Sequence, residues 1–262
     1  YDLDNDGDLE IAVGVARGES YNNVWVYQHN GSKYAPNWPQ LSSGCCAWGV
    51  WNTNLALGQL DGDARGELVV PSDTHYICAF EDDATRIAAN AIYGSKKWNE
   101  VGVWVNLATE IRGWGDCGTD HQANFAHSPA VISDVNGDGV NEVVVIGNVH
   151  NCATSPYTDL YNGPYIFNAD RSRFAASGFD WTSVPINTGA PLTEDYGIIE
   201  NCQSNPVTAD LDNDGNMEIL YPSYDGKMHC FWLDKTEHGN WPYAVYNPAD
   251  GFYRFASEPV VV

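Results

Sequence analysis

Residues 2–10 read Asp2-Leu3-Asp4-Asn5-Asp6-Gly7-Asp8-Leu9-Glu10, an acidic segment with a carboxylate at every second position and a glycine at the sixth. Two further segments repeat this pattern closely, at 134–142 and 210–218, and residues 59–67 repeat it in part. A β-branched or apolar run follows each copy, over 11–14, 68–70, 143–147 and 219–221. The chain is therefore predicted to repeat a strand, an acidic turn and a second strand.

The spacing of the oxygen atoms suggests what the acidic turn does. Side chains at positions 1, 3, 5 and 9, with a backbone carbonyl near position 7, can surround one hard cation, and calcium accepts ~6–8 such oxygens in irregular geometry. The alternative is a solvated hairpin turn, because Asp-Gly and Asn-Gly are common turn formers. Three close copies favour the metal interpretation. In the partial copy, Gln59 stands at position 1 and Ala64 where glycine is expected, so both interpretations stay open there.

Further strands are expected in each repeat. A third apolar run occurs at 24–27, 76–80, 165–167 and 229–232. Segments with Trp and Pro then follow, as in Asn37-Trp38-Pro39 and Asn240-Trp241-Pro242. Four short antiparallel strands per unit, repeated around an axis, predict an all-β fold, a β-propeller.

These acidic turns resemble the FG-GAP/VCBS repeat family, the calcium-binding propeller blades of integrin α-subunit heads and of many secreted microbial proteins. The resemblance is carried by Asp-x-Asp-x-Asp-Gly-x-x-Glu between the first two strands of a blade, and it implies about three or four calcium ions. The implied ligands are Asp2, Asp4, Asp6, Asp8 and Glu10; Asp61, Asp63 and Glu67; Asp134, Asn136, Asp138 and Glu142; and Asp210, Asp212, Asp214 and Glu218.

The four units are expected to form a single domain over 1–262, with blades at about 258–262 plus 1–45, 52–115, 128–190 and 204–257. Residues 257–262 read as a first strand without its acidic turn, and residues 1–10 as an acidic turn without its first strand. A closed four-bladed ring follows if the last strand completes the first blade. The alternative is part of a larger propeller, which a chain that begins at Tyr1 rather than Met leaves open.

Composition narrows the partners. The formal net charge of -23 argues against nucleic acid and against an anionic membrane surface, because both would repel the protein. No apolar stretch approaches the ~18 residues of a membrane span. The acidic turns hold 15 of the 35 Asp and Glu residues, and three calcium ions would change -23 to -17. Seven cysteines suit a secreted or cell-surface protein.

Long insertions at 34–54, 90–127, 148–163 and 182–203 are expected on the face opposite the acidic turns. Such loops usually carry binding function, so the favoured hypothesis is an extracellular binding or adhesion module for protein or glycan. The candidate ligand-face residues are Trp48, Trp51, Trp98, Trp114 and His121. The disulfide candidates are Cys117 with Cys152, and Cys45, Cys46 and Cys202 without a fixed pairing. Asn30 is a candidate glycosylation site.

Other tryptophans and cysteines are expected to be structural. Repeated strand or blade positions place Trp25, Trp38, Trp232 and Trp241 in the core, and Cys78 and Cys230 are expected to be small buried side chains.

Two alternatives remain for the function. An odd cysteine count fits a structural subunit of an extracellular filament or surface assembly, with self-association. Histidines in the insertions, among them His121, could instead serve a polysaccharide lyase or hydrolase. We expect a non-enzymatic protein, because nothing fixes the geometry of these histidines and the motifs of other catalytic sites are lacking.

Overall fold

The computed structural model describes residues 1–15, 22, 24–40, 55–71, 77–87, 129–149, 161–183, 191–193, 195, 198 and 205–262. Short antiparallel strands dominate this part of the chain, and a 3-10 helix spans Pro248–Asp250. The strands are β1 (Ile11–Gly14), β2 (Val24–Tyr27), β3 (Ala56–Gly58), β4 (Glu67–Pro71), β5 (Ile77–Phe80), β6 (Val131–Ser133), β7 (Glu142–Val149), β8 (Tyr161–Phe167), β9 (Ala175–Ala176), β10 (Phe179–Asp180), β11 (Val207–Ala209), β12 (Glu218–Pro222), β13 (Lys227–Phe231) and β14 (Tyr243–Ala244). The all-β prediction is confirmed. Among the described residues, no helix is long and apolar enough to cross a membrane.

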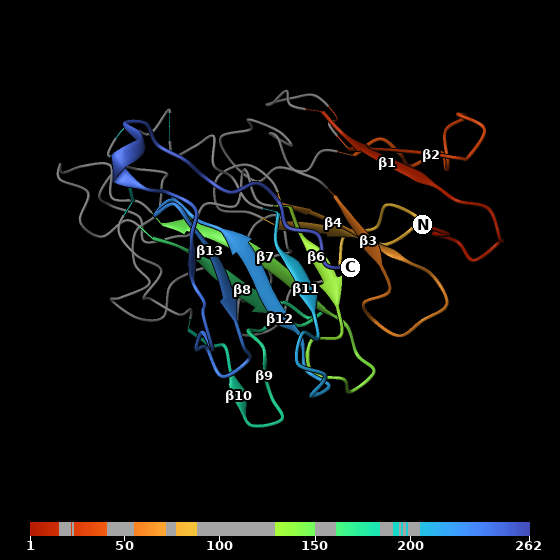
Figure 1. Ribbon diagram of the computed structural model, residues 1–262. Coiled ribbons are helices and arrows are strands. Elements are labelled where there is room, and N and C mark those ends of the chain that lie inside the picture. The colour runs from red at the N-terminus through yellow and green to blue at the C-terminus, as the bar shows by residue number, and fades with distance from the viewer. Residues whose placement is uncertain are drawn as a thin grey trace, which may run out of the picture.

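The strands form small meandering sheets in chain order (Figure 1). The orders are β1-β2, β3-β4-β5, β6-β7-β8 and β11-β12-β13-β14, with β9-β10 as a separate hairpin. Each predicted acidic turn that has a strand on both sides joins the first two strands of its sheet, with Gly58 opposite Glu67, Ser133 opposite Glu142 and Ala209 opposite Glu218. The predicted strand, acidic turn and strand are therefore confirmed in the last three units.

The sheets pack face to face, each on the next one in the sequence. Alternate residues of β4 point to opposite sides, so Leu68 and Val70 join a core with Val24 and Val26 of the first sheet, whereas Val69 joins a core with the third sheet. A third core lies between the last two sheets. Because the inner sheets are covered on both faces, β4 is buried at every residue. The result is a β-propeller-like stack.

Buried indoles repeat the same contact at two interfaces between sheets. Trp38, beyond β2, donates from Nε1 to the backbone oxygen of Asp82 at 2.9 Å. Trp181, beyond β10, donates from Nε1 to the backbone oxygen of Leu233 at 2.8 Å. Both acceptors lie two residues past the third strand of the following sheet. Each indole therefore fastens one sheet to the next through a buried hydrogen bond.

Closure of the ring is not observed in the described part of the chain. Residues 257–262 form no strand, although a first strand was expected at 258–262. The carboxylate of Glu258 instead accepts a hydrogen bond from the Asn205 side chain, so the segment lies beside the start of the fourth sheet. Within the described residues, β1 pairs with β2 alone. The blade count and boundaries stay predictions.

Three of the four tryptophans expected in the core are half-buried instead. Trp25 stacks on Tyr27 at a ring-centroid distance of 6.1 Å, and Trp232 stacks on His238 at 4.4 Å. Trp25 also lies under the Lys33 ammonium group, 5.4 Å from the ring centroid, and the Trp232 Nε1 donates to Asp212 at 2.9 Å. Trp38 is buried as expected, whereas Trp241 is half-buried. Cys78 and Cys230 are buried thiols, as predicted.

Candidate metal centres

The four acidic loops, which we number one to four in chain order, are hydrogen-bonded to one another in sequence. The backbone N–H of Gly66 donates to the oxygen of Leu3 at 2.9 Å, which joins the second loop to the first. Met217 N–H donates in the same way to the oxygen of Val135 at 2.8 Å, which joins the fourth to the third. Between the second and third, the Asn141 side chain donates to the oxygen of Gln59 at 2.7 Å. The loops thus lie side by side, as Figure 1 shows along one edge of the stack.

Loops one, three and four share one backbone path. At position 4 the values of φ are positive, 59° at Asn5 and 62° at Asn213, and at position 6 they are 97° at Gly7 and 93° at Gly215. Only glycine adopts the second of these values without strain, which explains the glycine of the motif. Gly137 and Gly139 give the third loop the same path, with φ of 70° and 88°.

The aspartate at position 1 organises each of these loops. Asp2 accepts hydrogen bonds from the backbone N–H groups of Asp6 and Gly7, both at 3.0 Å. Asp134 and Asp210 accept the equivalent pairs, at 2.8 to 3.1 Å. The backbone N–H groups wrap the first carboxylate and turn the later side chains toward one another.

The glutamate at position 9 is the most buried acidic side chain of every loop. Glu10, Glu67, Glu142 and Glu218 are at most 3% exposed. In each loop one carboxylate oxygen accepts a hydrogen bond from the backbone N–H at position 2, as between Glu10 and Leu3 at 2.8 Å. This bond ties the start of the second strand to the start of the loop.

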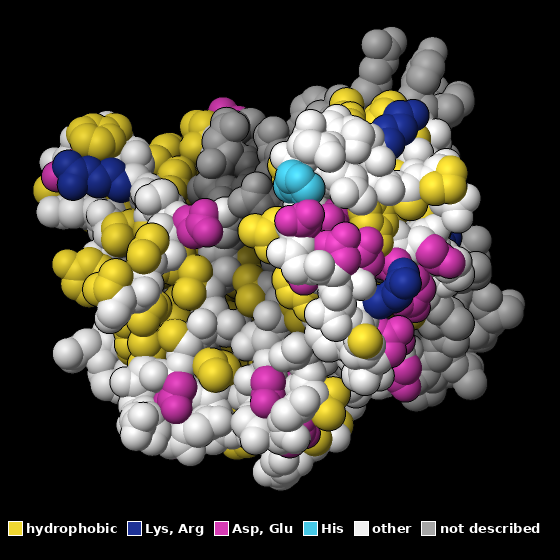
Figure 2. Space-filling model, turned by 90° about the vertical axis from the view of Figure 1, so that its right-hand side faces the viewer, with side chains coloured by type: hydrophobic (Ala, Val, Ile, Leu, Met, Phe, Trp, Pro, Cys, Tyr) yellow, Lys and Arg dark blue, Asp and Glu magenta, His cyan; other side chains and the backbone are white. Residues whose placement is uncertain are grey.

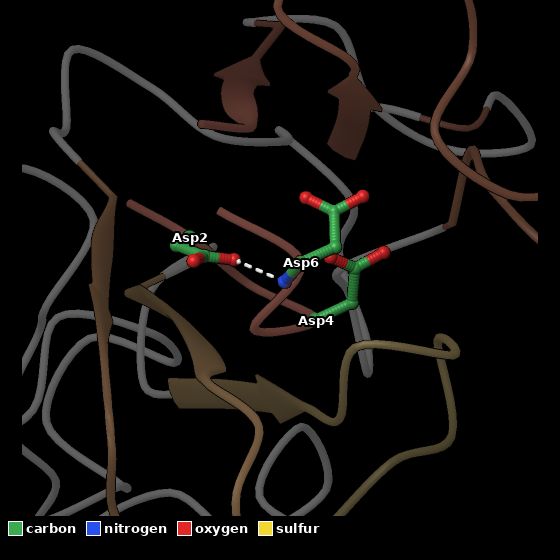
Figure 3. A group of neighbouring side chains, drawn as sticks. All are labelled: Asp2, Asp4 and Asp6. Atoms are coloured by element: carbon green, nitrogen blue, oxygen red, sulfur yellow. Dashed lines mark hydrogen bonds between the residues drawn. The ribbon is translucent and has the colours of Figure 1, made fainter. Parts of the chain in front are cut away.

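Carboxylates converge in three of the loops. Asp2, Asp4 and Asp6 each place an oxygen within 4.8 Å of the others, and Figure 3 shows the carboxylates of Asp4 and Asp6 side by side. Similar groups are Asp210 with Asp212 and Glu218, and Asp61 with Glu67 and Glu81. In the third loop Asn136 replaces one carboxylate, and its amide nitrogen donates to Asp138 at 3.0 Å. Among the described residues, these groups do not include Asp8, Glu10, Asp63, Asp214 or any residue of the third loop.

Every loop holds a buried acceptor oxygen without a hydrogen-bond donor among the described residues. The atoms are Asp4 Oδ1, Glu10 Oε1, Glu67 Oε1, Asn136 Oδ1 and Glu218 Oε1. All of them belong to position 3 or position 9. Buried acceptors are normally satisfied, so this repeated lack of a donor needs a physical cause. A hard cation with oxygen ligands would satisfy these atoms, so the residues fit calcium.

Without a bound ion, the charged form of the position-9 glutamates is destabilised by its surroundings. Burial raises the pKa of Glu67 and of Glu142 to about 7, and repulsion from neighbouring carboxylates adds to it. Burial also raises the pKa of Glu10 and Glu218. In all four the hydrogen bond from position 2 opposes the rise. A bound cation would instead lower the pKa of these glutamates, because it stabilises their charged form.

The second loop departs from the common path. Ala64 is not among the described residues with positive φ, and Gln59 Oε1 accepts from the N–H of Gly62 at 2.7 Å, one residue earlier than in the other loops. The Gln59 amide nitrogen donates to the backbone oxygens of Asp63 and Arg65, both at 2.7 Å. The carbonyl of Arg65, at position 7, is therefore already engaged.

Glu81 is the residue of these clusters that sequence reasoning missed. It follows β5 directly and lies outside the nine-residue pattern. Only its position in the turn after the third strand could have identified Glu81 as a ligand, and that position is informative only once the fold is known.

Other predicted residues take different places. The Asp8 carboxylate is exposed and lies 3.4 Å from Nδ1 of His29 rather than in the cluster. Asn30 is exposed, and its side-chain oxygen accepts from the N–H of Ser32 at 2.9 Å. The second unit has the same turn, in which the Asp83 carboxylate accepts a hydrogen bond from the N–H of Thr85. The sequon thus coincides with a turn that recurs after the third strand.

Several predictions fall outside the described residues. They concern Cys45, Cys46, Cys117, Cys152 and Cys202 as disulfide candidates, and Trp48, Trp51, Trp98, Trp114 and His121 as ligand-face candidates.

A separate buried cluster surrounds His229 in β13. Its Nδ1 lies 3.0 Å from Glu237 Oε1, and its Nε2 lies 3.2 Å from Asp225 Oδ1. Lys227 Nζ also contacts Asp225, at 3.0 Å. Burial lowers the pKa of His229, but the two carboxylates outweigh that effect and raise it. Both ring nitrogens face carboxylates, an arrangement that favours the charged form of the imidazole.

The surface is unevenly charged. Figure 2 looks onto the side where β1 and β2 lie in Figure 1, and it shows acidic side chains gathered over one part of this face. Few basic side chains lie among them, in keeping with 12 Lys and Arg against 35 Asp and Glu.

Comparison with known proteins gives a family match over part of the chain and a weak likeness to a solved structure. No curated protein matches the chain. The crystal structure of the exotype rhamnogalacturonan lyase YesX aligns at 12% identity with a TM-score of 0.35 and covers 88% of this chain. The alignment covers 36% of that structure, so the chain spans about a third of its length. Residues 2–70, which contain the first two acidic loops, match the FG-GAP-like repeat. The resemblance of the acidic turns to the FG-GAP repeat family is therefore confirmed over this part of the chain.

Proposed function

We propose that the protein is a calcium-stabilised, propeller-like extracellular module that binds protein or glycan. The observation that carries the calcium part is a buried acceptor oxygen in each of the four loops for which the described part of the chain offers no donor. These oxygens lie beside carboxylates that repel one another, and the guanidinium of Arg65, in the second loop, pairs with Asp82. Oxygen ligands without sulfur or imidazole suit calcium better than zinc or copper.

Residues of three loops would hold the ions in the arrangement of the family. Asp2, Asp4, Asp6 and Glu10 form one set, and the third and fourth loops supply the equivalent residues. Calcium would supply countercharge to the buried glutamates and so fix the junction between the first two strands. Its role is structural, because the second, third and fourth loops each join two paired strands and the first loop leads directly into β1.

An extracellular location supports a binding role. Repeats of this family are typically extracellular, where free calcium is abundant enough to fill weak sites. We place the ligand on the long insertions opposite the acidic loops. The net charge of -23 disfavours nucleic acid and supports a neutral or basic protein surface, or a neutral glycan, as partner.

Equilibrium dialysis against calcium tests the first part of the proposal. We expect about three or four ions per chain, and one fewer in Asp134→Asn or Asp210→Asn. Asp180→Asn serves as the matched control, because Asp180 accepts a similar hydrogen bond, from Thr182 at 2.9 Å, outside the loops. A wild-type chain that binds no calcium at millimolar concentration would overturn the proposal.

Arrays of glycans and extracellular matrix proteins test the second part. Binding should occur in calcium and weaken in chelator, since the loops support the scaffold that presents the insertions. If calcium binds to the protein but its removal leaves ligand binding undiminished, ligand binding does not depend on the loops, and the proposed link between the two is contradicted.

A further inference from the structure

A group of carboxylates beside the second loop includes a residue from outside the repeated pattern. Oxygens of Asp61, Glu67 and Glu81 lie within 4.8 Å of one another. Asp61 and Glu67 occupy positions 3 and 9 of the loop, whereas Glu81 follows β5. The three side chains reach one place from two separate segments of the chain.

The fourth sheet shows that this placement of Glu81 is built into the fold. Trp232 follows β13 as Glu81 follows β5, and its Nε1 donates to Oδ2 of Asp212 at 2.9 Å. Asp212 holds position 3 of the fourth loop, as Asp61 does in the second. The residue after the third strand therefore reaches position 3 in both units. In the other units this residue is uncharged, namely Gln28, Asn168 and Trp232.

Glu81 compensates for the carboxylate that the second loop lacks at position 1. Gln59 removes the carboxylate that the other loops have at position 1, and Glu81 adds one from outside. A donor such as Trp232 stabilises the aspartate it touches, but a second carboxylate repels it. The oxygens of Glu81 and Asp61 lie within 4.8 Å of each other. This arrangement is unfavourable unless a cation lies between the carboxylates.

An independent observation points to the same ligand. Glu67 is 0% exposed, and its Oε1 has no hydrogen-bond donor among the described residues. Arg65, the basic residue of this loop, forms an ion pair with Asp82. A fully buried carboxylate oxygen that lacks both a donor and a nearby unpaired cation is costly. A metal ion would remove that cost.

We propose that Asp61, Glu67 and Glu81 bind a calcium ion at a site that differs in its ligands from the other three loops. The Gln59 amide already engages the backbone oxygens of Asp63 and Arg65, so the ion is held on the side of the loop that faces Glu81. Glu81 thus replaces the missing carboxylate of position 1. This inference rests on the proposed calcium function but uses a different ligand set.

Calcium titration by calorimetry of the full chain tests the inference. Glu81→Gln, which introduces the residue type of Gln28, should abolish one site or weaken it by about tenfold or more, because even indirect partners of a metal cost that much. Asp83→Asn is the control. It removes a charge two residues away and keeps an acceptor for the Thr85 N–H, as Asn30 does in the first unit. This variant should bind as many ions as the wild type.

Asp61→Asn provides a second test, because Asp61 is exposed and its loss should not prevent folding. Circular dichroism confirms the fold of each variant. Unchanged binding in both Glu81→Gln and Asp61→Asn, with one ion lost in Asp210→Asn, would overturn this site and leave the proposed function intact. A wild type that binds no calcium would overturn both.

Discussion

Removal of calcium should lower the melting temperature by about 5 °C for each loop that binds an ion. At free calcium of 100 times the dissociation constant, one site contributes about 2.7 kcal/mol to the free energy of unfolding. For 262 residues the entropy of unfolding is about 0.55 kcal/mol per degree. Their ratio gives the shift per site, so three loops predict about 15 °C and four about 20 °C.

Differential scanning calorimetry in calcium and in excess chelator measures this shift. Magnesium should restore little of it, because magnesium demands octahedral geometry and retains water. Asp138→Ala should reduce the shift by about one site, beyond any loss from its hydrogen bond to Val140 at 2.9 Å. Asp180→Ala removes a comparable hydrogen bond and should leave the shift unchanged. An identical melting temperature with and without chelator would refute the reasoning.

Three other predictions concern single side chains. The stabilisation from charged His229 should be complete below pH 6.5, its ordinary pKa, and should be lost as the pH rises through the raised value. Urea unfolding at fixed calcium should show this fall in the free energy of unfolding with pH. A His229→Gln variant that keeps the same pH dependence would contradict the assignment. Trp181→Phe should cost about 2–3 kcal/mol in urea unfolding, because the Leu233 carbonyl loses its buried donor; a cost within about 0.5 kcal/mol would disprove this. Terbium bound at the fourth loop should luminesce on indole excitation, because Trp232 contacts Asp212. Trp232→Phe should reduce that emission, and an unchanged emission in this variant would place the ion elsewhere.

The strands of the last three units were predictable because each acidic turn there is followed by an apolar run that is buried on both sides. Val143 and Val144 of β7 face different cores, and a continuous apolar run is the pattern of a strand covered on both faces. The predicted strand at 258–262 had the same apolar character and yet does not form. A strand requires a partner edge, which composition cannot reveal.

The ligands were predictable only where they lie within the nine-residue pattern. Asp2, Asp4 and Asp6 converge because the first carboxylate and the positive φ values fold the loop on itself, and both features follow from local sequence. Glu81 lies 14 residues beyond Glu67 and reaches it through the pairing of β4 with β5. Trp181 escaped notice for the same reason, since its acceptor Leu233 belongs to another sheet.

The links between loops predict that the proposed calcium ions bind in pairs. The Leu3 N–H donates to the Glu10 carboxylate, and the Leu3 carbonyl accepts from the N–H of Gly66, the residue before Glu67. An ion that orders Glu10 therefore also fixes the backbone beside the glutamate of the next loop, which lowers the cost of ordering the second site.

Val135 connects the third and fourth loops in the same way, between Glu142 and Met217. The second and third loops are joined through the Asn141 side chain, which can rotate, so coupling there should be weaker. Calcium binding should accordingly show positive cooperativity within each pair, and Glu142→Gln should weaken the fourth site as well as the third. Independent binding at all sites, with Glu142→Gln affecting the third alone, would show that these backbone links transmit nothing.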